Sequence, residues 1–277
     1  MSVHGANSVA PSASLVIPVY NQLGYTKRCL DSIYKWTEPP FELIVVDNAS
    51  TDGTAEYLQS VAATVISNKT NLGCAKAWNQ GVRASRGDVV AILNNDIIVT
   101  SGWLSGLQRF METQRHGIVS PAAREGLLDY DLDEYAKQYT DRCRRATRAE
   151  LYGACLVIAR SVFDRVGLFD EVFGYGGCED IDFQWRAMEA GFTVGMTGSV
   201  LIHHFSMVTQ SAIVRAENHS YSTENLRHFT AKWNRTVRGN WFQRRWAGVK
   251  QAATESYEAA RYGHTLVERP GRQAPTR

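Results

Sequence analysis

The sequence has no run of the roughly 18 apolar residues that a membrane-spanning helix requires, and residues 1–14 lack the basic and apolar parts of a signal peptide. Its five cysteines form no C-x-x-C pair, which argues against a zinc site or a disulfide framework and favours free thiols in a reducing compartment. A formal net charge of +2 offers no global basis for binding nucleic acid. These absences together predict a soluble, cytoplasmic protein that does not bind nucleic acid.

The length and composition are those of a globular protein with one large domain and an appendage. A chain of 277 residues is near the upper limit for a single hydrophobic core, and its 44% hydrophobic and 21% charged residues exclude wholesale disorder. We expect a loose N-terminus at 1–13, the main domain at 14–234, a basic and aromatic helical segment at 235–266, and a disordered tail at 267–277.

Three apolar, β-branched segments in the first hundred residues each end in polar side chains. They lie at 15–19, 42–46 and 88–93, and they lead into Asn21, Asp47 and Asn94. Such runs are typical of buried parallel strands, and helical patterns between them predict βαβ units. Because ligands of open α/β sheets bind at the carboxyl ends of the strands, the polar residues there predict a binding site.

Two common classes of nucleotide-binding enzyme do not fit. No G-x-G-x-x-G pattern follows a strand, which excludes an NAD-dependent Rossmann enzyme. The loop after the first strand, YNQLG at 20–24, is neither glycine-rich nor basic, as a sugar nucleotidyltransferase would require to hold a triphosphate.

Eight sequence blocks, in order, resemble those of family 2 glycosyltransferases with a GT-A fold, over residues 15 to about 209. The blocks are PVYN at 18–21, DNASTDGT at 47–54, NLG at 71–73, LNND at 93–96, GAC at 153–155, GLFDE at 167–171, EDID at 179–182 and HH at 203–204. The resemblance implies an α/β GT-A fold: a Rossmann-like, mostly parallel sheet with helices on both faces, here with a C-terminal helical appendage.

The same resemblance implies an activity. The expected reaction moves a sugar from a UDP-, dTDP- or GDP-linked donor to a hydroxyl of a glycan or lipid-linked acceptor, with inversion and with Mn²⁺ or Mg²⁺. Surface polysaccharide assembly in bacteria is a common setting for the family. A catalytically silent protein of the same fold that binds glycans or nucleotide-sugars is the alternative, and neither donor nor acceptor follows from these blocks.

The metal ligands implied by the resemblance are Asp96 and His204. The family usually has a D-x-D triplet where this chain has Asn94-Asn95-Asp96, so a second ligand is needed. The family's late H-x-x-x-x-T stretch matches residues 204–209, and imidazole coordinates Mn²⁺ acceptably. His203 is the alternative ligand, because adjacent strand residues face opposite ways.

By the same resemblance Asp180 is the catalytic base, and Glu179 and Asp182 orient acceptor or donor hydroxyls. A carboxylate can accept the proton of an attacking hydroxyl, and the start of a helix favours its ionised form. Helix N-capping is the structural alternative for Asp180 and Asp182.

The remaining candidates are expected to contact the nucleotide-sugar. Capping of the following helix is an equal alternative for Asp52, and a surface role is the alternative for Lys76. The full set is Pro18, Tyr20, Asn21, Asp47, Asn48, Asp52, Asn71, Lys76, Asn79, Asn94 and Asn95.

Two segments allow opposing interpretations. Residues 124–150 change from acidic to basic and predict either a mobile lid over the site or a solvated helix pair. Residues 235–262 mix arginines with Trp241, Phe242 and Trp246, which suits peripheral contact with the inner face of a membrane or a lipid-linked acceptor. Packing of that helix onto the domain is the alternative.

Overall fold

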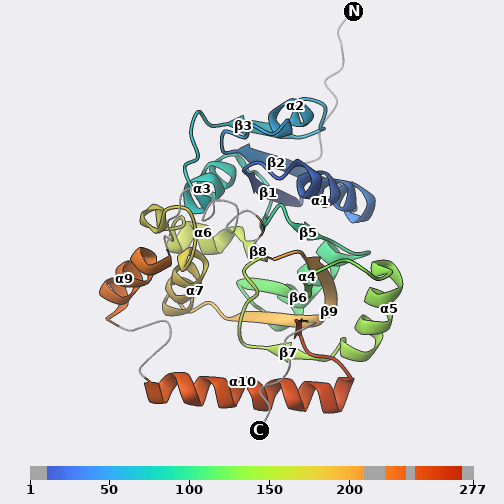
Figure 1. The fold of residues 1–277 in the computed structure, drawn as a ribbon. Helices are drawn as coiled ribbons and strands as arrows, with labels where there is room; N and C mark the ends of the chain where they lie inside the picture. The colour runs from blue at the N-terminus through green and yellow to red at the C-terminus, as the bar shows by residue number, and fades with distance from the viewer. Residues whose placement is uncertain (1–10, 207, 209–221, 235–240, 270–277) are drawn as a thin grey trace, which may run out of the picture.

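The computed structural model describes residues 11–206, 208, 222–234 and 241–269. A ten-stranded sheet with helices against both faces makes up the domain (Figure 1). The strands are β1 (Ala13–Val19), β2 (Phe41–Asp47), β3 (Thr64–Ser67), β4 (Val89–Leu93), β5 (Ile97–Ile98), β6 (Ile118–Glu125), β7 (Thr147–Arg148), β8 (Cys155–Ala159), β9 (Val194–His204) and β10 (Val267–Glu268). The helices are α1 (Leu23–Trp36), α2 (Thr54–Leu58), α3 (Cys74–Ala84), α4 (Trp103–Gln114), α5 (Leu132–Cys143), α6 (Arg160–Val166), η1 (Glu171–Phe173), α7 (Glu179–Glu189), α9 (Ser222–Trp233) and α10 (Trp241–Tyr262).

The sheet is mixed, and its strand directions bring distant segments to one edge. The order is β3-β2-β1-β4-β8-β6-β9-β5, with β10 beside β6 and β7 beside β9. Strands β1 to β4 are mutually parallel, β8 is antiparallel to both β4 and β6, and β9 is parallel to β6. Therefore β1, β2, β4, β6 and β9 all point their carboxyl ends the same way. The expected α/β fold is confirmed, with an antiparallel β8 in the middle of the sheet.

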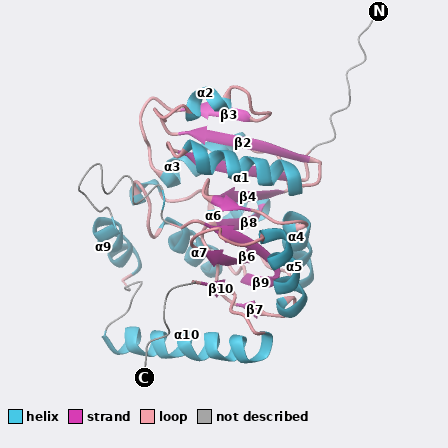
Figure 2. Ribbon diagram, turned by 45° about the vertical axis from the view of Figure 1, so that its right-hand side comes forward, coloured by secondary structure: helices cyan, strands magenta, loops and turns pink. Residues whose placement is uncertain are grey.

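Helices cover both faces because side chains of a strand alternate between faces. In β1, Leu15 and Ile17 join the core formed with α1, α4 and α5, whereas Val16 joins the core formed with α3, α6 and α7. Figure 2 shows the two helical layers on either side of the sheet. Helix α3 buries Trp78 and Val82, four residues apart on one face.

Helix α7 and strand β9 carry predicted site residues at their ends. Helix α7 begins at Glu179, which puts all three candidate carboxylates in its first turn. Strand β9 runs from Val194 to His204 and pairs with β6, with a shift in register after Pro121.

The acidic-to-basic segment at 124–150 is a packed part of the domain. It forms the end of β6, helix α5 and strand β7. Tyr139 of α5 is fully buried in the core, and its hydroxyl donates to the Thr265 carbonyl at 2.8 Å. The segment is therefore neither a mobile lid nor a solvated helix pair, because its single helix packs against the sheet.

The C-terminal segment is attached to the domain through its second half. Glu258 of α10 accepts two hydrogen bonds from Arg148, each 2.6 Å, and both side chains are at least nine-tenths buried. Val267–Glu268 pairs with β6 as β10, which corrects the disordered tail expected from 267. The side chains of Trp241, Phe242 and Trp246, on which the membrane interpretation rests, lie outside the described residues, as do 270–277. Among the described residues, no helix is long and apolar enough to cross a membrane.

Candidate active site

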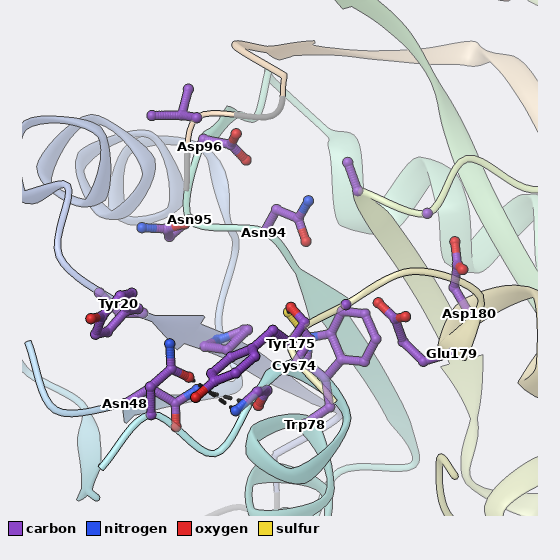
Figure 3. A pocket seen from close by; sticks show the side chains of 18 of the residues that line it. Tyr20, Asn48, Cys74, Trp78, Asn94, Asn95, Asp96, Tyr175, Glu179 and Asp180 are labelled. Atoms are coloured by element: carbon purple, nitrogen blue, oxygen red, sulfur yellow. Dashed lines mark hydrogen bonds between the residues drawn. The ribbon is translucent and has the colours of Figure 1, made fainter. Parts of the chain in front are cut away.

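A cavity of about 280 Å³ lies at the carboxyl ends of β1, β2, β4 and β9, facing the start of α7. Ten residues predicted for the site line it: Pro18, Tyr20, Asn48, Asn71, Asn94, Asn95, Asp96, Glu179, Asp180 and His204. In Figure 3, Asn94, Asn95 and Asp96 follow one another along one wall, and Glu179 and Asp180 lie on the other side of the view. Residues from six chain segments thus meet around one space.

Asp96 and His204 meet because Asp96 lies between β4 and β5, and β5 pairs with the end of β9 that carries His204. Ile97 is opposite His204 in that pairing, and the Phe205 amide donates to the Asp96 carbonyl at 2.9 Å. His204 Nε2 lies 3.2 Å from Asp96 Oδ1, yet the two atoms are not aligned for a hydrogen bond and Nε2 is buried without a partner. A buried nitrogen and a carboxylate oxygen directed at one space fit a divalent cation.

Two protein ligands suit a cation that completes its shell with phosphate oxygens and water. Among the described residues, no group of three or more His, Cys, Asp or Glu side chains could hold a metal by itself. The donor set therefore fits Mn²⁺ or Mg²⁺ shared with a bound phosphate group, and it does not fit a structural zinc site.

His203 faces away from the cavity. Its side chain is fully buried, and its Nδ1 lies 2.9 Å from the Tyr130 hydroxyl. Burial, followed by the neighbouring His204, lowers the pKa of His203 to about 4, so the ring is neutral at pH 7. Because adjacent residues of β9 point to opposite sides, only His204 reaches the cavity.

Glu179 and Asp180 form a pair of carboxyl groups at the N-terminus of α7. Asp180 Oδ1 accepts from the Ile181 amide at 2.8 Å, and Glu179 Oε2 is buried without a hydrogen-bond partner. Burial, with the charge of Asp180 added, raises the pKa of Glu179 above its ordinary value. Burial also raises the pKa of Asp180, and its backbone hydrogen bonds oppose this. A carboxylate with a raised pKa is a stronger base than an exposed one.

Two glycines allow the close approaches that shape this wall. A Cβ on Gly153 would lie 2.2 Å from Asp180 Oδ2, so the carboxylate rests directly on the backbone before β8. A Cβ on Gly73 would collide with the Gly174 carbonyl, and φ at Gly73 is +84°. The loop that leads into Glu179 and Asp180 is therefore seated on the start of α3, where only glycine fits.

The wall at the ends of β1 and β2 is polar and internally bonded. Asn48 donates to the Gly73 carbonyl at 3.3 Å and accepts from Asn68 at 2.8 Å. The side chain of Asn95 donates to Thr26 of α1 at 3.0 Å. These bonds hold the wall in place before any ligand arrives.

Three predicted contacts at the strand ends instead build the loops behind the cavity. Asn21 Oδ1 accepts from the Thr51 amide at 2.7 Å. Asp47 is buried and accepts from the Ser50 amide at 3.0 Å. Asp52 accepts from the Leu23 amide at 3.0 Å and from Thr54. None of the three carboxamide and carboxylate side chains lines the cavity.

Lys76, Asn79 and Asp182 also lie outside the cavity. Lys76 is on the exposed side of α3. Asn79 is buried and binds both the amide and the carbonyl of Phe169, at 3.0 and 2.9 Å. Asp182 is fully buried and bonds to Arg186 at 2.8 Å and to the Trp233 indole at 2.9 Å. Asn79 thus joins α3 to the loop after α6, and Asp182 joins α9 to α7, the helix that carries the carboxylates.

Sequence reasoning missed three aromatic residues of the site. Trp78 and Tyr175 line the cavity, and the Tyr152 hydroxyl lies 2.5 Å from His204 Nδ1. Trp78 had a signal in the sequence, because it lies four residues after Cys74, on the same helix face, and both line the cavity. Tyr152 had no signal, because its partner is 52 residues away in the chain.

The fold is similar to the GT-A fold of glycosyltransferases of known structure. GalNAc-T7, solved with UDP, GalNAc and Mn²⁺, superposes with a TM-score of 0.56 at 18% identity, over 71% of this chain and 44% of that one. The mannosyltransferase PcManGT of Pyrobaculum calidifontis, solved with GDP-Man and Mn²⁺, gives 0.55 at 21% identity, over 76% and 62%. The chain spans less than two thirds of either protein, and at these identities the likeness shows the fold alone.

The family follows from sequence comparison. Residues 14–172, more than half of the chain, match the family described as glycosyl transferase family 2, and the chain belongs to that family. Glycosyltransferase AglE of Haloferax volcanii is 32% identical over 213 residues, 71% of this chain and 68% of that protein. An uncharacterized glycosyltransferase of Rickettsia typhi is 23% identical over 253 residues, 82% and 72% of the two chains. The protein is an enzyme of glycosyl transfer.

Proposed function

We propose that this enzyme transfers a sugar, with inversion and with Mn²⁺ or Mg²⁺, from a nucleoside-diphosphate sugar to an acceptor hydroxyl. The observation that carries the proposal is the division of one cavity into two walls. Asp96 and His204 form the wall suited to a cation. Glu179 and Asp180 lie across the view from Asp96 in Figure 3 and form the facing wall. A single displacement needs both a cation beside the leaving group and a base beside the acceptor, and the residues for both line this one cavity.

The wall with Asp96 and His204 is the side for the leaving group. A divalent cation there would supply Lewis-acid stabilisation of the departing nucleoside diphosphate. Asn48 and Tyr20, at the ends of β2 and β1, are placed to contact the nucleoside beyond it. The neighbours solved with UDP or GDP-Man and Mn²⁺ support a nucleotide-sugar donor of this kind.

The wall with Asp180 is the acceptor side. Its carboxylate accepts the proton of the attacking hydroxyl, and its raised pKa increases its strength as a base. The raised pKa of Glu179 favours its protonated form, in which it can donate a hydrogen bond to a sugar oxygen. Attack from the side opposite the leaving group, without a second nucleophile, inverts the anomeric configuration.

The cellular location and the acceptor are proposed from the cysteines and the sequence. All five cysteines are free thiols, which suits a reducing, cytoplasmic compartment. A glycan or lipid-linked acceptor, surface polysaccharide assembly and peripheral contact at the inner face of a membrane are proposed from the sequence of the C-terminal segment and the family resemblance.

The test is a panel of UDP-, dTDP- and GDP-sugars with purified protein, with and without Mn²⁺. A true donor binds the native state and raises the melting temperature, and it is hydrolysed slowly or transferred. Asp96→Ala should remain folded and lose both the metal-dependent shift and turnover. Binding without any turnover across acceptors would favour the silent binding protein, and full activity in excess EDTA would remove the metal from the reaction.

A further inference from the structure

A line of hydrogen-bonded side chains runs from the C-terminal segment to His204. Arg269 Nε donates to Glu125 Oε2 at 3.0 Å. The Tyr152 hydroxyl lies 2.9 Å from Glu125 Oε1 and 2.5 Å from His204 Nδ1. None of Arg269, Glu125 and Tyr152 has a role in the proposed reaction.

The protons in this line can be assigned by counting donors. A tyrosine hydroxyl has one proton to donate, and a carboxylate only accepts. Glu125 accepts a hydrogen bond from Arg269 on its other oxygen and has no proton of its own to donate. The Tyr152 proton therefore goes to Glu125. His204 Nδ1 must then carry a hydrogen, which it donates to the hydroxyl oxygen of Tyr152.

The opposite assignment leaves the contact with Glu125 unsatisfied and directs a hydrogen, in place of a lone pair, at the cation site. If Tyr152 donated to His204, Glu125 Oε1 would face a hydroxyl oxygen at 2.9 Å with no proton between them. His204 Nε2 would then carry a hydrogen toward Asp96, where the atoms are 3.2 Å apart without the alignment of a hydrogen bond. Burial makes such unsatisfied polar contacts costly.

We propose that Tyr152, held by Glu125 and Arg269, is a positioning residue that keeps His204 in its Nδ1–H tautomer with the Nε2 lone pair directed at the cation site beside Asp96. The inference rests on the proposed metal dependence and adds residues to it. Tyr152 is itself fixed, because it is nine-tenths buried and its amide donates to Ser120 Oγ at 2.9 Å. Partners behind a metal-binding histidine set its tautomer and orientation in this way.

The arrangement also gives the C-terminal segment a role in the site. Arg269 directly follows β10, and β10 pairs with β6, the strand that ends in Glu125. Arg269, the last described residue, therefore supplies the charge that holds Glu125 in the accepting position for Tyr152.

The first experiment measures the tautomer by long-range ¹⁵N–¹H NMR of the full, metal-free chain, with the His204 signals assigned from His204→Ala. We expect the Nδ1–H pattern in the unchanged protein and a shift toward Nε2–H in Tyr152→Phe. Tyr139→Phe is the matched control, because it also removes a buried hydroxyl that donates one hydrogen bond, at 2.8 Å, but far from His204. An Nε2–H pattern in the unchanged protein, or no change in Tyr152→Phe, would overturn the inference.

The second experiment measures Mn²⁺ affinity from the EPR signal of free Mn²⁺, at a fixed concentration of UDP or GDP, because the two protein ligands share the cation with a phosphate group. Loss of a partner behind a metal ligand typically weakens affinity by about 10–100-fold, so Tyr152→Phe should show such a loss and Tyr139→Phe none. Equal affinity of the two variants would overturn the positioning role. If the unchanged chain binds no Mn²⁺, the proposed metal dependence fails as well, which distinguishes the two failures.

Discussion

Replacing Gly153 by alanine should disable the base without unfolding the protein. The added Cβ would lie 2.2 Å from Asp180 Oδ2, whereas ordinary contact begins at 3.4 Å. The carboxylate must therefore retreat by more than 1 Å. Backbone strain is not involved, because φ at Gly153 is outside the left-handed range. The displaced atom is the end of a side chain, so the cost in stability is small.

The cost in rate is expected to be large. A catalytic group misplaced by about 1 Å can lose on the order of 10²-fold in rate. We expect kcat of Gly153→Ala to fall by about that factor, with donor affinity and melting temperature close to those of the unchanged protein. Gly24→Ala is the control, since nothing lies within 4 Å of its added Cβ.

The assay is steady-state transfer to an acceptor, with Asp180→Asn as a second background. If Gly153→Ala acts through Asp180, adding it to Asp180→Asn should cost little more than Asp180→Asn alone. A kcat within threefold of the unchanged protein would refute the reasoning. So would a double variant that loses the full product of the two single effects.

Three further predictions follow from the same geometry. His204→Ala should weaken dependence on Mn²⁺ far more than His203→Ala, measured as the Mn²⁺ concentration for half-maximal rate; the reverse order would show that the other imidazole is the ligand. Asp180→Asn should lower kcat by about 10²–10⁴-fold. In the unchanged enzyme the rate should rise with pH through a midpoint above 3.8, because burial raises the pKa of a base that works only when ionised. NMR of the product should show an inverted anomeric centre, and a retained one would exclude direct displacement. Glu258→Ala should lower the free energy of unfolding by about 3 kcal/mol in urea, because it leaves Arg148 buried with only the exposed Glu150 as an ion-pair partner; an unchanged midpoint would mean that α10 is held elsewhere.

Local pattern was sufficient for the framework of the site. Apolar runs ending in polar residues predicted β1, β2 and β4, and their shared direction predicted that Asn48 and Asp96 lie at one edge. The order of the sequence blocks predicted that Asp180 and His204 join them, as the cavity shows. These predictions hold because strand direction and period follow from a few neighbouring residues.

Tertiary contacts decided which polar residues are free to act. Asn79 and Asp182 have the same chemistry as the residues of the cavity, yet each is occupied by partners on other elements, Phe169 and Trp233. No local pattern reveals this, because Asn79 and its partner are 90 residues apart in the chain.

The sequence by itself thus determined the α/β class, the family and the edge of the sheet where the candidate site lies. Only the tertiary structure decided that β10 belongs to the domain, that Tyr152 stands behind His204, and that Gly153 supports Asp180. The physical reason is range. Backbone conformation responds to near neighbours, whereas the partner of a side chain is set by the packing of elements that are distant in the chain.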